Sequence, residues 1–381
     1  MAVSINKITN WIGNSGLVEK DGQNKGGVYS YFDQNQNKFG FLYPEITGYF
    51  ISTQRFLFET CNDQLLIENA RNSADWLIGI IEKFGGIIQG INTEKSRGTL
   101  VYTFDTAICA NAFLDCYLLT KNEKYLNFSK SLSRWIIDEA LEADGTLKPY
   151  QNLDTKNFEE DTNLWYKQKG CLHVKVAIPL IRLYDVTKDE NFLTSSSLIC
   201  NSVKKYLKSD GSILLHSNEK IIHLHSLCYA LEGLLHCYGI TKNEEYLKNC
   251  IKCLQWCQSK MEKDGSTMLW YNSKYPNAKT SYHTAQLVRL MILVDLATKS
   301  HEFGDPIEKS LSFLASLQAI DEDSRINGGF YEEYYKTLLG WKIRKRVNSW
   351  GSFLHFRQRT GITILTHCLL SMKYHFYFKI F

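Results

Sequence analysis

The sequence predicts an all-α fold, an (α/α)6 toroid of six inner and six outer helices that forms a single domain over residues 1–381. A helix-like apolar stretch recurs and ends in a Tyr-x-x-Thr hinge followed by a Tyr-Leu or Phe-Leu pair, as at 117–126, 184–193 and 238–247. Each repeat also begins at a turn that contains glycine, at 26–27, 85–86, 144–145, 210–211, 264–265 and 328–329. Repetition of one helical unit along a chain is typical of repeat architectures.

The first helix of each repeat is predicted to be buried. Its sequence is apolar on every face and almost free of charge, which is typical of a helix surrounded by protein. These inner helices are predicted over residues 45–59, 104–119, 172–186, 224–240, 282–297 and 348–370. The chain has only five prolines, which suits long helices because an interior proline breaks them.

The second helix of each repeat is amphipathic and is predicted to lie on the surface. These outer helices are predicted over residues 63–82, 123–141, 190–207, 244–260 and 304–319, each with one apolar stripe opposite Lys and Glu. The sixth outer helix is predicted at the N-terminus, over residues 4–14, where Ile5, Ile8 and Ile12 have helical spacing. Because this helix precedes the first glycine turn, it would complete the outer ring and bring the two termini together.

Four segments carry a resemblance to the six-hairpin glycosidase superfamily and its related polysaccharide lyases and sugar epimerases: YPEITGY at 43–49, FDTA at 104–107, YHTAQ at 282–286 and NSW at 348–350. The resemblance covers most of the chain and implies the toroid and a carbohydrate substrate. Residues 258–266 also resemble repeats of the squalene-cyclase and prenyltransferase toroids, which share this architecture. The chain lacks both the acidic Asp-x-Asp-Asp cluster of terpene cyclisation and the zinc ligands of a lanthionine cyclase.

A polar or ionisable residue opens every apolar inner helix. Because the inner helices of a toroid all begin at the same end, we expect these residues to face one cavity. A sealed core would not favour them, since burying an ionisable group costs several kcal/mol unless the group is paired. The residues at these positions are Glu45, Asp105, His173, His225, His283 and the pair Ser349-Trp350.

Asp105 and Glu45 are the predicted catalytic residues. Glycoside hydrolysis uses two carboxyl groups beside the scissile bond, one as an acid and the other as a base or nucleophile. In six-hairpin hydrolases that act on uronyl sugars, an aspartate at an inner-helix start donates the proton, so the resemblance implies this role for Asp105. The alternative is helix capping, because a carboxylate near a helix N-terminus gains about 0.3–1 kcal/mol from the dipole without any catalysis.

His173, His225 and His283 are predicted to bind substrate. A pair of histidines on inner helices resembles the arrangement in N-acylglucosamine epimerase, and imidazole titrates near neutral pH, as proton transfer requires. Three histidines can also hold zinc, but these come from three consecutive repeats and the chain has no His-x-x-x-His motif, so no metal or other cofactor is predicted. Packing or capping within the core is the alternative for each of them.

Aromatic residues are dense in the loops that lead into the inner helices, and Tyr43, Tyr282 and Trp350 are predicted to contact substrate. Flat rings suit stacking on pyranose faces. The alternative is that these loops pack on one another and cap the ring. The sixth loop adds Glu332 and the basic run at 342–346, and Arg344 would favour an anionic sugar such as a uronic acid. A solvated loop is the alternative explanation of that run.

Composition limits the partners and the location. The net charge of +4 is too small to indicate nucleic acid, and no uninterrupted apolar stretch is long enough to predict a membrane span. The eleven cysteines follow no pairing pattern, and Cys250, Cys253 and Cys257 lie at helical spacing that indicates buried packing. Together with the absence of a signal-peptide pattern over 1–18, this predicts a cytoplasmic protein.

Three functions stay open at this point. The first is hydrolysis, or a related acid–base step, on an oligosaccharide that includes uronic-acid-containing glycans. The second is an epimerase or lyase that uses His and Tyr. The third is a catalytically silent toroid that binds glycans or proteins. Convergence of Glu45 with Asp105 would favour the first, convergence of His225 with His283 the second, and a centre filled by aromatic loops the third.

Overall fold

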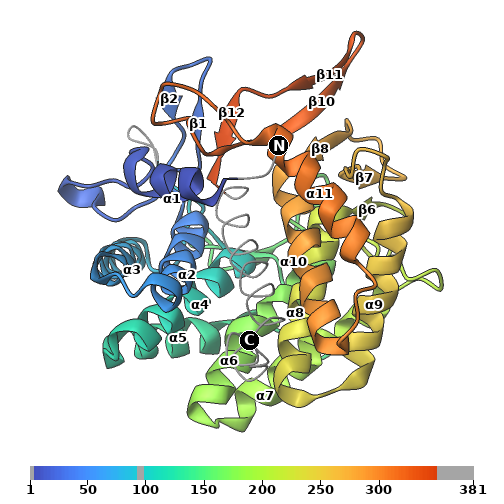
Figure 1. The fold of residues 1–381 in the computed structure, drawn as a ribbon. Helices are drawn as coiled ribbons and strands as arrows, with labels where there is room; N and C mark the ends of the chain where they lie inside the picture. Colours follow the sequence, from blue (N-terminus) through green and yellow to red (C-terminus); the bar gives the residue numbers. More distant parts are fainter. Residues whose placement is uncertain (1–3, 92–97, 350–381) are drawn as a thin grey trace.

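The computed structural model describes residues 4–91 and 98–349, and these form eleven α-helices arranged in a ring (Figure 1). The described inner helices are α2 (Pro44–Cys61), α4 (Thr103–Thr120), α6 (Ala177–Thr187), α8 (Leu224–Thr241) and α10 (Ser281–Thr298). A 3-10 segment, η3 (Cys171–Val176), leads into α6. The inner helix predicted over 348–370 lies outside the described residues, as does Trp350.

The outer helices flank the inner ones in the predicted order. They are α3 (Gln64–Phe84), α5 (Glu123–Trp135), α7 (Glu190–Asn201), α9 (Glu244–Ser259), α11 (Gly304–Leu317) and α1 (Ile5–Asn14). A π-helical turn, η2 (Ile136–Ala140), extends α5, and a 3-10 turn, η4 (Ser202–Lys205), follows α7. A further 3-10 turn, η1 (Gly22–Asn24), follows α1. The predicted all-α toroid is confirmed.

The recurring hinge has a specific backbone geometry that explains its repetition. Each described inner helix ends at a residue in the left-handed region, with φ between 54° and 60°, at Asn62, Lys121, Lys188, Lys242 and Lys299. After four of these residues comes an Asp or Asn whose side chain accepts a hydrogen bond from the backbone of the next outer helix. This N-cap satisfies an otherwise unpaired N–H, so the chain stops one helix and starts the next within two residues.

The glycine turns show that α1 completes the outer ring. Gly211, Gly265 and Gly328 have positive φ, and a Cβ on each would lie within 2.2–2.7 Å of an outer-helix backbone atom. For Gly265 that helix is α11, and for Gly328 it is α1, where the contact is with Lys7. The N-terminal helix therefore occupies the place after the sixth turn that α11 occupies after the fifth. The indole of Trp11 also donates to the carbonyl of Arg325 at 2.9 Å.

Short strands lie in the connections between glycine turns and inner helices, and those labelled in Figure 1 lie toward the top of the view, at one end of the ring. One sheet joins sequence-distant segments, because β1 (Tyr31–Asp33) pairs with β12 (Arg346–Asn348) and with β2 (Lys38–Phe39), and β12 pairs with β9 (Phe330–Tyr331). The other strands are β3 (Leu100–Tyr102), β4 (Tyr150–Asn152), β5 (Phe158–Glu159), β6 (Ile222–His223), β7 (Trp270–Tyr271), β8 (Ala278–Thr280), β10 (Glu333–Thr337) and β11 (Gly340–Ile343).

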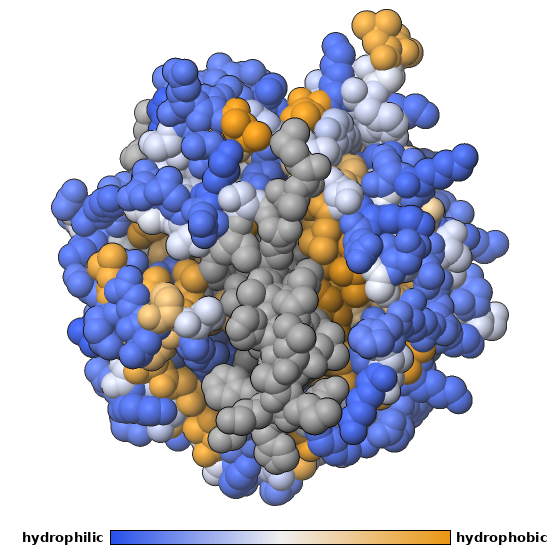
Figure 2. Space-filling view, in the orientation of Figure 1, coloured by the Kyte–Doolittle hydropathy of each residue, from blue (hydrophilic) through white to orange (hydrophobic). Residues whose placement is uncertain are grey.

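The surface of this fold is largely hydrophilic in the view of Figure 2. The β10–β11 hairpin projects from the strand-bearing end, and its tip carries two fully exposed leucines, Leu338 and Leu339. Nine of the ten cysteines that the structure describes are buried, and all ten are free thiols. None of the helices within residues 4–91 and 98–349 has both the length and the apolar character needed to cross a bilayer.

Candidate active site

A cavity of about 290 Å³ opens where the inner helices begin, at the strand-bearing end of the ring. We call it the mouth cavity. Its wall is made by the first turns of α2, α4, α8 and α10, by η3, and by the loops around residues 165 and 332. Six of the residues singled out from the sequence line it: Tyr43, Glu45, Asp105, His225, Tyr282 and Glu332.

Glu45 and Asp105 form a buried carboxyl pair in this wall. Both lie in the first turn of an inner helix, and their exposed fractions are only 4% and 5%. Burial raises the pKa of Asp105 well above its usual value, and the neighbouring charge of Glu45 raises it further. The Oδ2 atom of Asp105 has no hydrogen-bond partner among the described residues. Asp105 is therefore a carboxyl that favours its protonated form and retains an unused hydrogen-bonding oxygen.

Tyr43 supports the pair from the residue just before α2. Its buried hydroxyl interacts with the carboxyl groups of Glu45 and Asp105, and hydrogen bonding from Tyr43 partly offsets the rise in the pKa of Asp105. A phenol that donates to a carboxylate stabilises its charged form. The wall thus places a carboxyl group held toward protonation beside a second carboxyl group, and Tyr43 interacts with both.

Two neutral histidines line another part of the cavity. The Nδ1 atom of His225 lies 2.5 Å from Oε1 of Gln286, so Nδ1 donates and Nε2 keeps its lone pair. Burial lowers the pKa of His225 to about 3, so the ring is uncharged near neutral pH. His223 precedes α8 in extended backbone, and its ring stacks on Trp270 at a centroid distance of 4.0 Å. Two residues spaced by two on a helix would point about 200° apart. His223 lies before the helix in extended backbone, so both rings reach the cavity.

Tyr229 lies between His225 and the start of α4, and it connects the mouth cavity to the interior of the toroid. Its ring centroid lies 4.3 Å from that of His225 and 4.8 Å from that of Phe104, which precedes Asp105. Below it, Lys175 donates to the hydroxyl of Tyr49 at 2.9 Å, and Tyr49 hydrogen-bonds to Tyr229. Lys175 and Tyr49 thus hold the Tyr229 hydroxyl in place at the cavity wall.

Glu332 brings a third carboxyl group to the cavity from the loop between β9 and β10. Burial and the adjacent Glu333 raise the pKa of Glu332 to about 7, while Arg346, whose Nη1 lies 3.3 Å from its Oε2, opposes the rise. Arg344 does not line the cavity and binds Glu333 at 2.7 Å. The basic run therefore neutralises carboxylates of its own loop.

His173 and His283, also singled out from the sequence, do not line the mouth cavity. His173 lies in η3, where burial lowers its pKa to about 4. His283 is fully buried and is held by Thr280 on one nitrogen and by Thr267, at 2.9 Å, on the other. The 3-10 start of the third inner helix shifts its register, so Leu172 occupies the wall there.

The residues that reach the cavity follow a simple positional rule. The second residue of each of the four inner α-helices that line the cavity faces it: Glu45, Phe104, His225 and Tyr282. The third residue reaches it in α4, as Asp105, but not in α10, as His283. Sequence reasoning gave no site role to His223, Tyr102, Tyr229 and Gln89, which also line the cavity. Tyr229 had a usable signal, since it follows His225 by four residues on one helix face.

Within the described part of the chain, no group of three or more His, Cys, Asp or Glu side chains is placed to hold a metal ion. Neither a protein-family model nor a curated protein matches the sequence.

The structure is similar to cellobiose 2-epimerase from Bacillus thermoamylovorans, with 15% identity, 93% of this chain and 99% of that chain covered, and a TM-score of 0.74. It is similar to an unsaturated glucuronyl hydrolase specific for heparin, with 10% identity, coverage of 95% and 96%, and a TM-score of 0.69. D-mannose isomerase gives 13% identity, coverage of 94% and 96%, and a TM-score of 0.76. The chain has the (α/α)6 fold of six-hairpin glycosidase-like proteins. At these identities the likeness extends to the fold of the toroid alone.

Proposed function

We propose that this protein is a carbohydrate-active enzyme that cleaves a glycosidic bond in the mouth cavity by acid–base chemistry. The observation that carries the proposal is the buried pair of Glu45 and Asp105. Two carboxyl groups in one site, one of them favouring protonation, are the groups that glycoside hydrolysis requires. The comparisons support it, since an unsaturated glucuronyl hydrolase shares the fold.

In this mechanism Asp105 donates its proton to the glycosidic oxygen as the bond to the anomeric carbon breaks. Glu45 acts as the base: with Tyr43 hydrogen-bonded to it, it takes a proton from the water that attacks that carbon. The proton lost by Asp105 leaves with the alcohol product. Before the next cycle Glu45 releases its proton to solvent and Asp105 takes one up. The hydroxyl of Tyr229 donates to a sugar oxygen.

The described lining favours a neutral sugar over a uronate. It contains the carboxyl groups of Glu45, Asp105 and Glu332, and no Lys or Arg among the described residues that form it. A uronate carboxylate placed there would be repelled and would lack the bidentate Arg partner that such groups prefer. Aromatic rings of Trp165, Tyr166 and Tyr282 offer stacking surfaces that need no charge.

Epimerisation or isomerisation is the second candidate, and the pair His223 and His225 favours it. Cellobiose 2-epimerase and D-mannose isomerase share the fold. A neutral imidazole with a free lone pair can remove a proton next to a sugar carbonyl. However, burial lowers the pKa of His225 to about 3, which makes it a weak base, so hydrolysis is the better-supported function.

The test is a panel of neutral and uronyl disaccharides incubated with the wild-type protein and with Asp105→Asn. Products are separated so that hydrolysis and change of configuration are scored independently. We expect hydrolysis of a neutral disaccharide, and we expect Asp105→Asn to lower kcat by about 10²–10⁴-fold because the general acid is lost.

Asp295→Asn is the matched control. Asp295 is also a buried carboxyl, but it lies in the last turn of α10, where it accepts hydrogen bonds from the backbone of Phe303. Its substitution is expected to leave kcat unchanged. Equal hydrolysis by wild type and Asp105→Asn would contradict the proposal, and epimer formation without hydrolysis would select the second candidate.

A further inference from the structure

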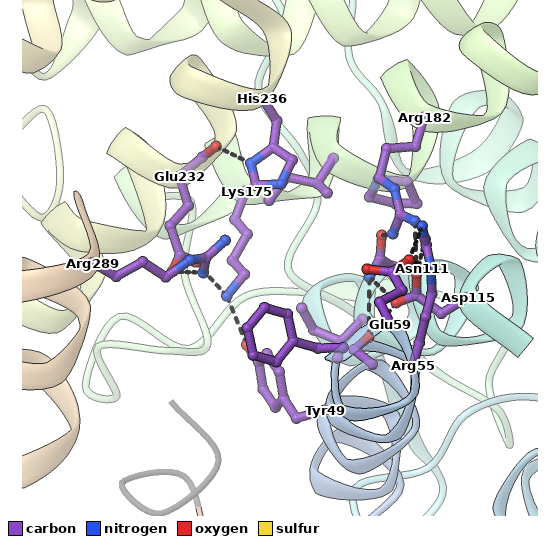
Figure 3. Close-up of a pocket in the computed structure, with 15 residues that line it drawn as sticks. Tyr49, Arg55, Glu59, Asn111, Asp115, Lys175, Arg182, Glu232, His236 and Arg289 are labelled. Atoms are coloured by element: carbon purple, nitrogen blue, oxygen red, sulfur yellow. Dashed lines mark hydrogen bonds and ion pairs between the residues drawn. The ribbon is translucent and has the colours of Figure 1, made fainter. Parts of the chain in front are cut away.

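A second cavity lies farther along the inner helices, on the other side of Tyr49 and Lys175 from the mouth cavity. It has a volume of about 50 Å³, and we call it the far pocket. Figure 3 shows two groups of charged and polar side chains facing each other across it. One group is Lys175, Glu232, His236 and Arg289, and the other is Arg55, Glu59, Asn111, Asp115 and Arg182.

In each group, one buried carboxylate serves two cations. Asp115 Oδ1 lies 2.8 Å from Arg55 and 2.6 Å from Arg182. Glu232 lies 2.6 Å from Lys175 and 2.9 Å from Arg289. The side chains of the two carboxylates are 4% and 1% exposed, so this is charge within the protein rather than at its surface.

Both carboxylates are ionised, so the count of charges is clear. The flanking arginines lower the pKa of Asp115, and Lys175 followed by Arg289 lowers that of Glu232 to about 2, in both cases against the opposing effect of burial. Lys175 and three arginines therefore face three carboxylates: the two buried ones and Glu59, which pairs with Arg55 at 2.8 Å and lies about one-third exposed at the rim. The pocket has an excess of positive charge.

An excess of buried charge is costly unless a counter-charge is present. His236 responds to this excess, because burial and then the charges of Arg289 and Arg182 lower its pKa to about 3. Glu59, Asp115 and Glu232 are the carboxylates among the described residues that line the pocket. A bound anion would supply the counter-charge that the described lining lacks.

We propose that the far pocket binds a small tetrahedral oxyanion of the phosphate type. Arg182 and Arg289 approach from α6 and α10, and planar guanidinium groups are the preferred partners of phosphate oxygens because they donate paired hydrogen bonds. The volume of about 50 Å³ suits a free ion rather than a sugar phosphate. This site is separate from the mouth cavity and does not depend on the reaction proposed there.

The experiment is isothermal titration of the purified protein with inorganic phosphate, with a sodium chloride titration at matched ionic strength. We expect saturable 1:1 binding of phosphate, and a rise in Tm with phosphate that chloride does not produce. A parallel titration with glucose 6-phosphate distinguishes a free ion from a phosphorylated sugar. Binding of inorganic phosphate but not of glucose 6-phosphate identifies the free ion as the ligand, whereas equal affinity for the two identifies a phosphoryl group. Identical responses to phosphate and chloride would overturn the proposal without any variant.

Arg289→Gln locates the site. It removes a charged donor but leaves Glu232 paired with Lys175, and we expect the phosphate affinity to fall about tenfold or more. Arg134→Gln, at an arginine whose side chain is 65% exposed, is the matched control and should bind as wild type does. Arg182→Gln is the second variant if Arg289→Gln does not fold. Unchanged affinity in a folded Arg182 or Arg289 variant would place the ion elsewhere and reject the site.

Discussion

The two cavities share the inner helices α2, α4, α8 and α10 and the segment η3, yet their electrostatics are opposite. The mouth cavity holds carboxyl groups and neutral histidines, and burial raises the pKa of Asp105. The far pocket holds four cations, and two of them, Lys175 and Arg289, lower the pKa of Glu232. Burial acts on both carboxyl groups in the same direction, so the difference comes from their partners. A like charge leaves Asp105 ready to donate a proton, whereas two cations fix Glu232 as an anion.

The largest expected effect is on activity, which should depend on the carboxyl groups of the mouth cavity and not on those of the far pocket. Glu45→Gln removes the proposed base and should lower kcat by at least about 100-fold. It also removes the charge that raises the pKa of Asp105, so the activity that remains should be lost at a lower pH than in wild type. The measurement is kcat/KM as a function of pH. Glu59→Gln makes the same change at the rim of the far pocket and should leave the pH profile of kcat/KM unchanged. An equal loss of kcat in Glu59→Gln would contradict the assignment of catalysis to the mouth cavity.

The next largest effect is on stability, and here the far pocket should matter most. Glu232→Gln leaves Lys175 and Arg289 as buried charges without their carboxylate, which should lower the free energy of unfolding by about 3–5 kcal/mol. Glu245→Gln, which breaks an ion pair with Lys204 in which both side chains are about half exposed, should cost less than about 1 kcal/mol. Urea unfolding measures both. Equal costs would mean that the far pocket is as well hydrated as the surface.

The pH dependence of stability should carry both signs. The pKa of Asp105 is higher in the folded than in the unfolded chain, so its contribution is fully present below about pH 3.8 and declines as pH rises through the folded pKa. The pKa of Glu232 falls from 4.5 to about 2 on folding, so its contribution of about 3 kcal/mol is present above pH 4.5 and is lost toward pH 2. Asp105→Asn should remove only the decline on the alkaline side. An unchanged alkaline slope in that variant would contradict the raised pKa.

The fold could be predicted from the sequence because it depends on repeated local signals. The left-handed residue at Lys121, Lys188 and Lys242 and the cap that follows recur with the hinge, and each repeat carries its own glycine turn. Even the closure by α1 follows from counting outer helices. These features act over a few residues, so a single chain displays them without knowledge of the tertiary contacts.

The sites were harder to predict, because they depend on register and on pairing between helices. Asp105 and His283 hold the same position in their helices, yet one lines the cavity and the other is held by threonines. Successive side chains on a helix point about 100° apart, so a small difference in how a helix is rotated about its axis decides which residue faces the cavity. The far pocket escaped prediction because Asp115, Arg182 and Glu232 are scattered single charges within apolar helices. They become a cluster only when neighbouring inner helices bring them together.

The smallest expected effect tests whether the two ends communicate. Lys175 at the far pocket donates to Tyr49, and Tyr49 hydrogen-bonds to Tyr229 in the mouth cavity. Tyr49→Phe breaks this chain, so the Tyr229 hydroxyl would lose its orientation, and we expect kcat/KM to fall about fivefold, the value of one hydrogen bond of about 1 kcal/mol. Tyr125→Phe, which removes a hydrogen bond to Asp75 on an outer helix, is the control and should cost similar stability without changing kcat/KM. If both variants retained wild-type kcat/KM, the two cavities would be independent sites that share only a scaffold.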